Sequence, residues 1–131
     1  MKHLLYFAIA FVFLSACSSQ GTPEEEAAKA AQTYYMLLAD SLPEDFLNIR
    51  VGADSLPASY RAQMQKVYEQ YIREVNAKHR GIREVRISNN VARHDSTQHV
   101  TYAFLILCFG DSTQEEVMVP MVEVGGKWLM K

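Results

Sequence analysis

The hydrophobic period of the chain changes at Gly81, and this change constrains the fold more than any other feature. Before Gly81, apolar residues recur at the spacing of a helix that faces a core, whereas after it they tend to alternate with polar residues, as in a strand. Helices followed by strands favour an α+β fold. We therefore expect N-terminal helices packed on one face of a curved, four-stranded antiparallel sheet.

The first predicted helix begins at Pro23. Thr22 supplies the N-cap, Pro23 occupies the first turn, where its missing N–H costs nothing, and Glu25 completes a capping box. The apolar face of this helix consists of Ala27, Ala28, Ala31, Tyr34, Tyr35 and Leu38. A short second helix is expected over residues 43–48.

The third predicted helix has the most regular pattern. Its apolar face consists of Tyr60, Met64, Val67, Tyr68, Tyr71, Ile72 and Val75. Basic side chains crowd its last turn and Gly81 follows, which is a conventional helix stop. We expect this helix to cover one face of the sheet.

Four strands in a meander are expected after Gly81. They cover residues 82–93, 99–109, 115–124 and 127–131. Asn89-Asn90 indicates a bend or a bulge, Pro120 requires an edge position or a bulge, and Gly125-Gly126 is a two-residue hairpin turn.

The second strand is apolar on both faces from Ala103 onward. A sheet with one face in water alternates apolar with polar residues, so the second face needs cover from the first helices, a curled sheet, a ligand or a partner. We hypothesise that this second face, above all Leu105 and Leu107, forms a pocket wall or a sheet-to-sheet homodimer contact.

The N-terminus carries a targeting signal. A basic start precedes an apolar run over residues 4–14, which is too short for a membrane span of about 20 residues and matches a signal peptide. Leu14-Ser15-Ala16-Cys17 resembles the bacterial lipoprotein box, whose cysteine receives diacylglycerol and a further acyl chain such as palmitate. We expect residues 1–16 to be a lipoprotein signal peptide, residues 17–22 a lipidated tether and residues 23–131 the domain.

The residue after the lipidation site bears on localisation. Ser18 stands where enteric lipoproteins retained in the inner membrane carry Asp. We expect a lipid-anchored protein of the cell envelope, in the outer membrane rather than the inner membrane.

With Cys17 lipidated, Cys108 has no internal partner and is expected to be a small buried hydrophobe. The net charge of −2 gives no electrostatic case for nucleic-acid binding.

The order of these elements resembles the cystatin-like, nuclear-transport-factor-2-like superfamily, and within it the small lipoproteins of unknown function found in Bacteroidetes. Gly126-Lys127-Trp128 matches the closing hairpin of these lipoproteins, although Leu129 stands where they usually carry a second Lys. The resemblance implies a cone whose helices and sheet enclose a pocket. Some members are isomerases or dehydratases that use an Asp, Tyr or His there, and many have no known activity.

Tyrosines are the candidate lining of such a pocket: Tyr34, Tyr35, Tyr68, Tyr71 and Tyr102. Their hydroxyls can polarise a carbonyl group, but at helical spacing the favoured interpretation is a core with hydroxyls at its rim. Asp40 would be the acid nearest to the pocket, and no second acid or base lies at a sequence spacing from it that indicates a catalytic pair. The sequence therefore assigns no catalytic residue.

His94, Asp95 and His99 flank one predicted turn, and a four-residue hairpin would make the two histidines cross-strand neighbours. A zinc site needs three or four protein ligands in suitable geometry, which this turn does not readily offer. We predict a solvated turn, with no metal ion and no cofactor.

Three function classes follow. The favoured one is a non-enzymatic, membrane-anchored lipoprotein module that binds a small apolar ligand or an envelope protein partner. The alternatives are a pocket enzyme of the isomerase or dehydratase type and a structural accessory subunit of an envelope complex. The enzyme requires an ionisable group of shifted pKa in an apolar cleft, whereas the other two do not.

Replacing Cys17 with Ala tests the anchor. Two or more acyl chains give durable membrane attachment, because each buried CH₂ contributes about 0.8 kcal/mol. We expect Cys17→Ala to abolish metabolic lipid labelling and to release any mature product into the soluble fraction. A variant that still carries labelled lipid and fractionates with membranes would show that Cys17 is not the anchor.

Overall fold

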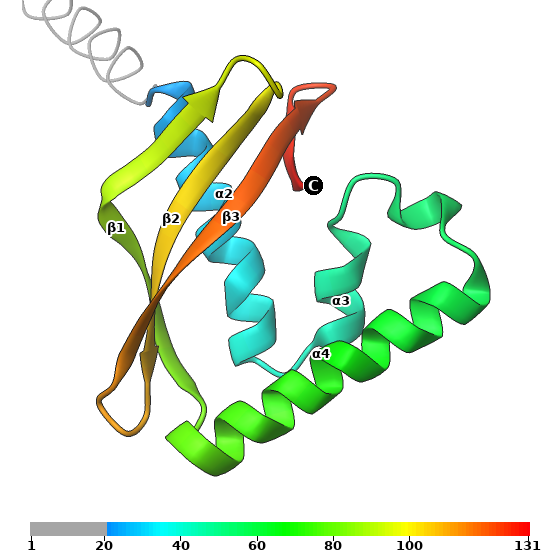
Figure 1. Ribbon diagram of the computed structural model, residues 1–131, viewed down its shortest axis with the longest axis vertical. Coiled ribbons are helices and arrows are strands. Elements are labelled where there is room, and N and C mark those ends of the chain that lie inside the picture. Colours follow the sequence, from blue (N-terminus) through cyan, green and yellow to red (C-terminus); the bar gives the residue numbers. More distant parts are fainter. Residues whose placement is uncertain (1–20) are drawn as a thin grey trace, which may run out of the picture.

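The computed structural model describes residues 21–131, in which helices precede an antiparallel sheet (Figure 1). The helical elements are α2 (Pro23–Ala39), α3 (Pro43–Asn48), the 3₁₀ turn η1 (Ala53–Ser55) and α4 (Ala58–His79). The strands are β1 (Ile82–Asp95), β2 (Val100–Phe109), β3 (Gln114–Val124) and β4 (Lys127–Met130). They lie in the order β1-β2-β3-β4, so the predicted α+β class and its meander are confirmed.

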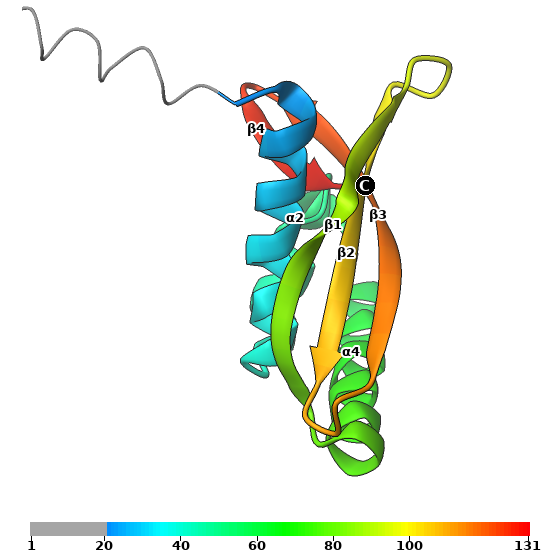
Figure 2. The same ribbon diagram turned by 90° about the vertical axis from the view of Figure 1, so that its left-hand side faces the viewer.

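Helix α2 begins as predicted and covers the sheet. The Thr22 hydroxyl accepts a hydrogen bond from the Glu25 N–H at 3.2 Å, which satisfies one of the unpaired donors of the first turn. Ala27, Ala28 and Ala31 are completely buried. Because alanine side chains are small, the helix backbone lies close against β1 and β2 (Figure 2).

The expectation that the third helix covers the sheet is wrong. Helix α4 packs mainly on α3 and crosses near the far end of α2 (Figure 1). Only Tyr68 and Val75 of its apolar face are buried, whereas Tyr60 and Val67 are 47% and 51% exposed. The alanine face of α2 already occupies the sheet, so α4 is left with a partly uncovered apolar face.

The face of β2 that carries Leu105 and Leu107 packs inside the molecule. Leu105 and Leu107 are completely buried in the intramolecular core, on the side of the sheet that α2 covers. They therefore do not form an accessible homodimer contact. The residues that alternate with them, Phe104 and Ile106, face away from the core and are partly exposed. Cys108 is buried and unpaired among the described residues, as expected.

The bend predicted at Asn89-Asn90 is present as a break in the β1–β2 register between Ile87 and Ala92. The extra residues leave the ladder, and Val91 takes a positive φ of 56° there. Such a bulge bends a strand and increases its twist, which lets the long β1 curve around α2.

The predicted hairpin turn between the last two strands is confirmed. Gly125 and Gly126 both have positive φ values, 58° and 79°, which a two-residue hairpin of this kind requires. The edge position or bulge predicted at Pro120 is wrong, because β3 lies between β2 and β4 and its register with β2 is unbroken at Pro120. The carbonyl oxygen of Pro120 accepts a hydrogen bond from the Lys131 N–H at 2.9 Å. The nitrogen of Pro120 faces the same side, just where β4 ends, so its missing N–H breaks no ladder.

The predicted signal peptide, Cys17 and most of the tether lie outside the described residues. Within residues 21–131, no helix is long and apolar enough to cross a membrane.

Candidate functional site

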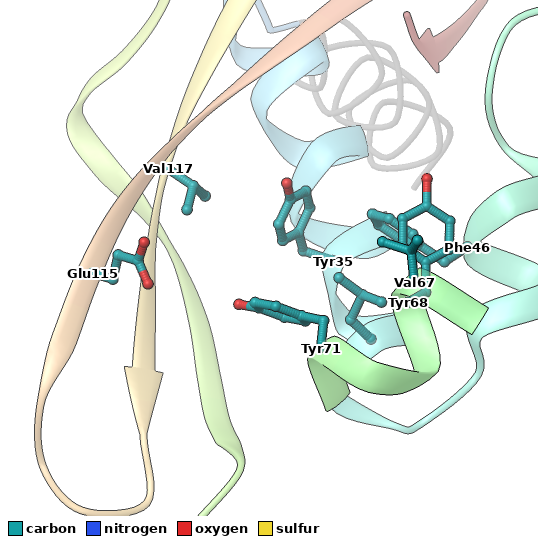
Figure 3. A pocket seen from close by; sticks show the side chains of 8 residues that line it. Tyr35, Phe46, Val67, Tyr68, Tyr71, Glu115 and Val117 are labelled. Atoms are coloured by element: carbon teal, nitrogen blue, oxygen red, sulfur yellow. The ribbon is translucent and has the colours of Figure 1, made fainter. Parts of the chain in front are cut away.

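A pocket opens between the three α-helices and β3, and we call it the tyrosine pocket (Figure 3). Its volume is about 300 Å³, the lower end of the range of small-molecule sites. It is lined by Tyr35 and Leu38 of α2, Phe46 of α3, Val67, Tyr68 and Tyr71 of α4, and Glu115 and Val117 of β3.

Phe46 organises the back of the tyrosine pocket. Its ring packs edge-on against Tyr35, with ring centroids 5.4 Å apart, and against Tyr68, with centroids 5.0 Å apart. Edge-to-face contacts are the favourable geometry for aromatic rings, because the positive edge of one meets the negative face of the other. The three rings thus form one packed wall joining α2, α3 and α4.

The opposite side of the pocket is open because α4 packs on α3 and meets the sheet only near its own C-terminal end. Tyr71 projects from α4 toward β3, where Glu115 and Val117 lie across the pocket, and Val67 lies beside Phe46 (Figure 3). The hydroxyl of Tyr71 points toward the carboxylate of Glu115. The exposed apolar face of α4 therefore becomes one wall of a cavity.

One of the three tyrosine hydroxyls of the pocket forms a hydrogen bond within the described part of the protein, and the other two do not. Tyr68 accepts a hydrogen bond from Nη1 of Arg50 at 2.5 Å, and Nη2 of the same guanidinium donates to the carbonyl of Lys131. The hydroxyls of Tyr35 and Tyr71 have no hydrogen-bond partner within residues 21–131. These two groups remain available to a ligand.

Both of these tyrosines are held in the neutral form. Burial raises the pKa of Tyr35, the nearby Tyr71, Tyr68 and Glu115 raise it further, and Arg50 opposes them. Burial also raises the pKa of Tyr71, and the negative charge of Glu115 adds to that effect. The hydroxyls therefore act as hydrogen-bonding groups at neutral pH, and neither is poised as a general base.

The structure brings only some of the predicted pocket residues together. Tyr35, Tyr68 and Tyr71 line the tyrosine pocket. Tyr34 instead donates a hydrogen bond at 2.6 Å to the carbonyl of Trp128, which ties α2 to β4. Tyr102 donates to the side chain of Gln98 at 2.9 Å, at the β1–β2 turn.

Sequence reasoning did not assign five residues to the pocket: Leu38, Val67, Phe46, Glu115 and Val117. Period-two alternation on β3 carries the signal for the last two, because Glu115 shares the inward register with Val117 and pairs with the buried Leu107. A charged residue at an inward position is a functional hint. Phe46 lies in a helix of six residues, too short to show a face.

A second polar cluster lies beside the pocket, at the end of α4. Nδ1 of His79 lies 2.8 Å from the carboxylate of Asp111, and the His79 ring stacks on Phe109 with centroids 4.9 Å apart. Hydrogen bonds from the Thr113 side chain, from His79 and from the Thr113 backbone lower the pKa of Asp111 to about 2. The backbone N–H of Asp111 also bonds to the His79 carbonyl. The cluster joins the end of α4 to the β2–β3 turn, and this architectural role accounts for its contacts.

The predicted pairing of His94 with His99 is wrong. The register places His94 opposite Thr101, and Nδ1 of His94 lies 2.9 Å from the Thr101 hydroxyl. Asp95 caps the backbone of the turn instead of facing either histidine. Among residues 21–131, no three His, Cys, Asp or Glu side chains come together in a way that could hold a metal ion.

Comparison with solved structures supports the fold. The chain resembles a Campylobacter jejuni protein named as an NTF2-like transpeptidase, with a TM-score of 0.58 and 13% identity, over 76% of this chain and 92% of that one. At this identity the likeness shows the fold alone, so the expected nuclear-transport-factor-2-like fold is confirmed. The sequence matches no protein-family model and no curated protein.

Proposed function

We propose that this protein is a membrane-anchored, non-enzymatic module that holds a small apolar ligand in the tyrosine pocket. One observation carries the proposal: an aromatic cavity of about 300 Å³ in which two hydroxyls have no hydrogen-bond partner among residues 21–131. Protein interiors are close-packed, so an apolar hollow forgoes contacts that a ligand would restore. Apolar pockets with a few convergent polar groups are typical ligand sites, and the fold fits a pocket domain.

The anchor in this proposal is lipid on Cys17. It would hold the domain beside a membrane of the cell envelope, through a tether over residues 17–22, with the outer membrane favoured by Ser18. A Bacteroidetes-type lipoprotein would fit this arrangement. The pocket would then sample small molecules of the envelope.

The enzyme and the accessory subunit remain the alternatives. An isomerase or dehydratase needs a proton acceptor at the reacting carbon, and Glu115 is the only carboxylate that lines the tyrosine pocket. Its side chain is exposed to solvent, and the shifted pKa values of Tyr35 and Tyr71 lie in the direction that disfavours a base. Binding therefore has the stronger support.

A second candidate function, self-association, is favoured by the outer face of the sheet, which we define as Tyr102, Phe104, Ile106, Met118 and Pro120. Met118 is 54% exposed. The register places Arg86 on one side of Ile106 and Glu116 on the other, all pointing away from α2. A two-fold axis parallel to the strands, lying between two such faces, would set each Arg86 against Glu116 of a second copy, with Ile106 against Ile106. We propose a homodimer of this geometry, since isologous contacts require such self-complementarity.

Filling the tyrosine pocket tests the ligand proposal. We expect Val67→Trp, which adds bulk at an exposed lining position, to weaken binding of 2-phenylethanol about tenfold or more, equivalent to about 1.4 kcal/mol. Titration calorimetry of the full chain in phosphatidylcholine nanodiscs measures this, with empty nanodiscs subtracted. The control is Lys66→Trp, an exposed neighbour outside the pocket. Equal binding by both variants, or no binding by the unmodified chain, would contradict the proposal.

Charge reversal tests the homodimer. Arg86→Glu would set like charges against each other at two points, so we expect it to shift the full chain toward monomer in sedimentation equilibrium. Arg86→Glu combined with Glu116→Arg should restore the dimer. Leu105→Ala, one position from Ile106 but facing the core, should instead lower the free energy of unfolding by about 2–5 kcal/mol. A chain that is monomeric before any substitution would exclude this interface.

A further inference from the structure

The tyrosine pocket contains one formally charged side chain at neutral pH, and it is an acid. Glu115 lies at an inward position of β3, opposite Leu107 of β2, and its carboxylate points into the pocket (Figure 3). The ion pair found within residues 21–131 joins His79 to Asp111 and leaves Glu115 without a cationic partner. Because the Glu115 side chain is exposed, water hydrates its carboxylate, and a cationic group bound in the pocket would replace part of that water with a charge pair.

No lysine, arginine or histidine lines the tyrosine pocket. Arg50 is the nearby cation that lowers the pKa of Tyr35, but its guanidinium is already committed to the Tyr68 hydroxyl and the Lys131 carbonyl. Lys78 and His79 line an adjoining hollow together with Glu115, but neither lies in the tyrosine pocket and neither forms an ion pair with Glu115. The positive charge that would complement Glu115 is therefore not supplied by the tyrosine pocket itself.

The other polar atoms of the pocket can also accept hydrogen bonds from a cation. Besides the carboxylate of Glu115, the hydroxyl oxygens of Tyr35 and Tyr71 have no partner among residues 21–131, and each can accept a hydrogen bond. The electron-rich faces of tyrosine and phenylalanine rings also attract cations within about 6 Å of their centres. An ammonium group offers three donors and no acceptor, which suits the carboxylate of Glu115 and the Tyr71 hydroxyl that points toward it.

We propose that the ligand of the tyrosine pocket is an organic cation, with an ammonium group facing Glu115 and Tyr71 and an apolar body packed on Phe46 and Leu38. This inference depends on the proposed function and adds the charge of the ligand to it. The cavity of about 300 Å³ is about twice the size of one that holds benzene, so a single-ring amine fits it.

The same geometry disfavours the other ligand charges. An anion would meet the charge of Glu115 with no cation in the pocket lining to pair with, and a neutral ligand would gain only apolar burial and neutral hydrogen bonds. Because the Glu115 side chain is exposed, its attraction for a cation is screened by salt. Affinity should therefore fall in the order cation, neutral molecule, anion, and the advantage of the cation should shrink at high ionic strength.

Three ligands of one shape test this order: phenethylammonium, 2-phenylethanol and phenylacetate. Titration calorimetry uses the full chain in phosphatidylcholine nanodiscs at neutral pH, with empty nanodiscs subtracted. We expect phenethylammonium to bind about fivefold more tightly than 2-phenylethanol, because one partly exposed charge pair with a cation–π contact contributes a free energy of about that size. We expect phenylacetate to bind most weakly.

Two carboxylates of β3 provide the matched variants. Glu115→Gln keeps the shape of the side chain and removes its charge, so we expect the preference for phenethylammonium to disappear while 2-phenylethanol binds as before. Glu123→Gln changes an exposed carboxylate of the same strand that lies outside the pocket lining and outside the proposed homodimer contact, and should leave all three affinities unchanged. Melting temperatures of both variants confirm that each is folded.

The possible outcomes separate this inference from the proposed function. Equal affinities for the three ligands, abolished together by Val67→Trp, would overturn the cationic ligand and leave the pocket as a binding site. A preference for the cation that survives Glu115→Gln would overturn the role of Glu115. Failure of all three ligands to bind would overturn both the inference and the proposed function.

Discussion

The close packing of the alanine face of α2 against the sheet is the contact on which the remaining architecture depends. Ala27, Ala28 and Ala31 let the helix backbone approach β1 and β2, and the side chains of Leu105 and Leu107 fill the space beneath it. With that face of the sheet occupied, α4 packs on α3 instead and its apolar face remains half covered. The tyrosine pocket is the space that this displacement leaves between α4 and β3.

The sequence predicts the elements well and their tertiary roles less well, for a physical reason. Caps and turns are local, so Thr22 and Gly125-Gly126 indicate their conformations directly. Periodicity assigns each residue to a face of its own element, but it does not say which helix covers which sheet face. A long apolar face on the third helix suggested more burial than an alanine face, although small side chains permit the closer approach.

The residues of the candidate site were likewise predictable only in part. Tyr35, Tyr68 and Tyr71 could be named from their helical spacing, whereas Glu115 and Val117 enter the pocket only because β3 faces α4 across a gap. The two faces of the sheet thereby serve different purposes in our account. The inner face supplies the core and one wall of the pocket, and the outer face around Ile106 remains available to a second copy of the chain.

The most direct test of the central claim, that the tyrosine pocket is the ligand site, is a solution NMR titration with tyrosine rings labelled by ¹³C. The described residues carry matched internal controls, since Tyr34, Tyr60 and Tyr102 lie outside the pocket. The account predicts that phenethylammonium shifts the ring signals of Tyr35, Tyr68 and Tyr71 together, with one saturating dependence on concentration. Shifts confined to the control tyrosines, or no saturable shift at any ring, would contradict it.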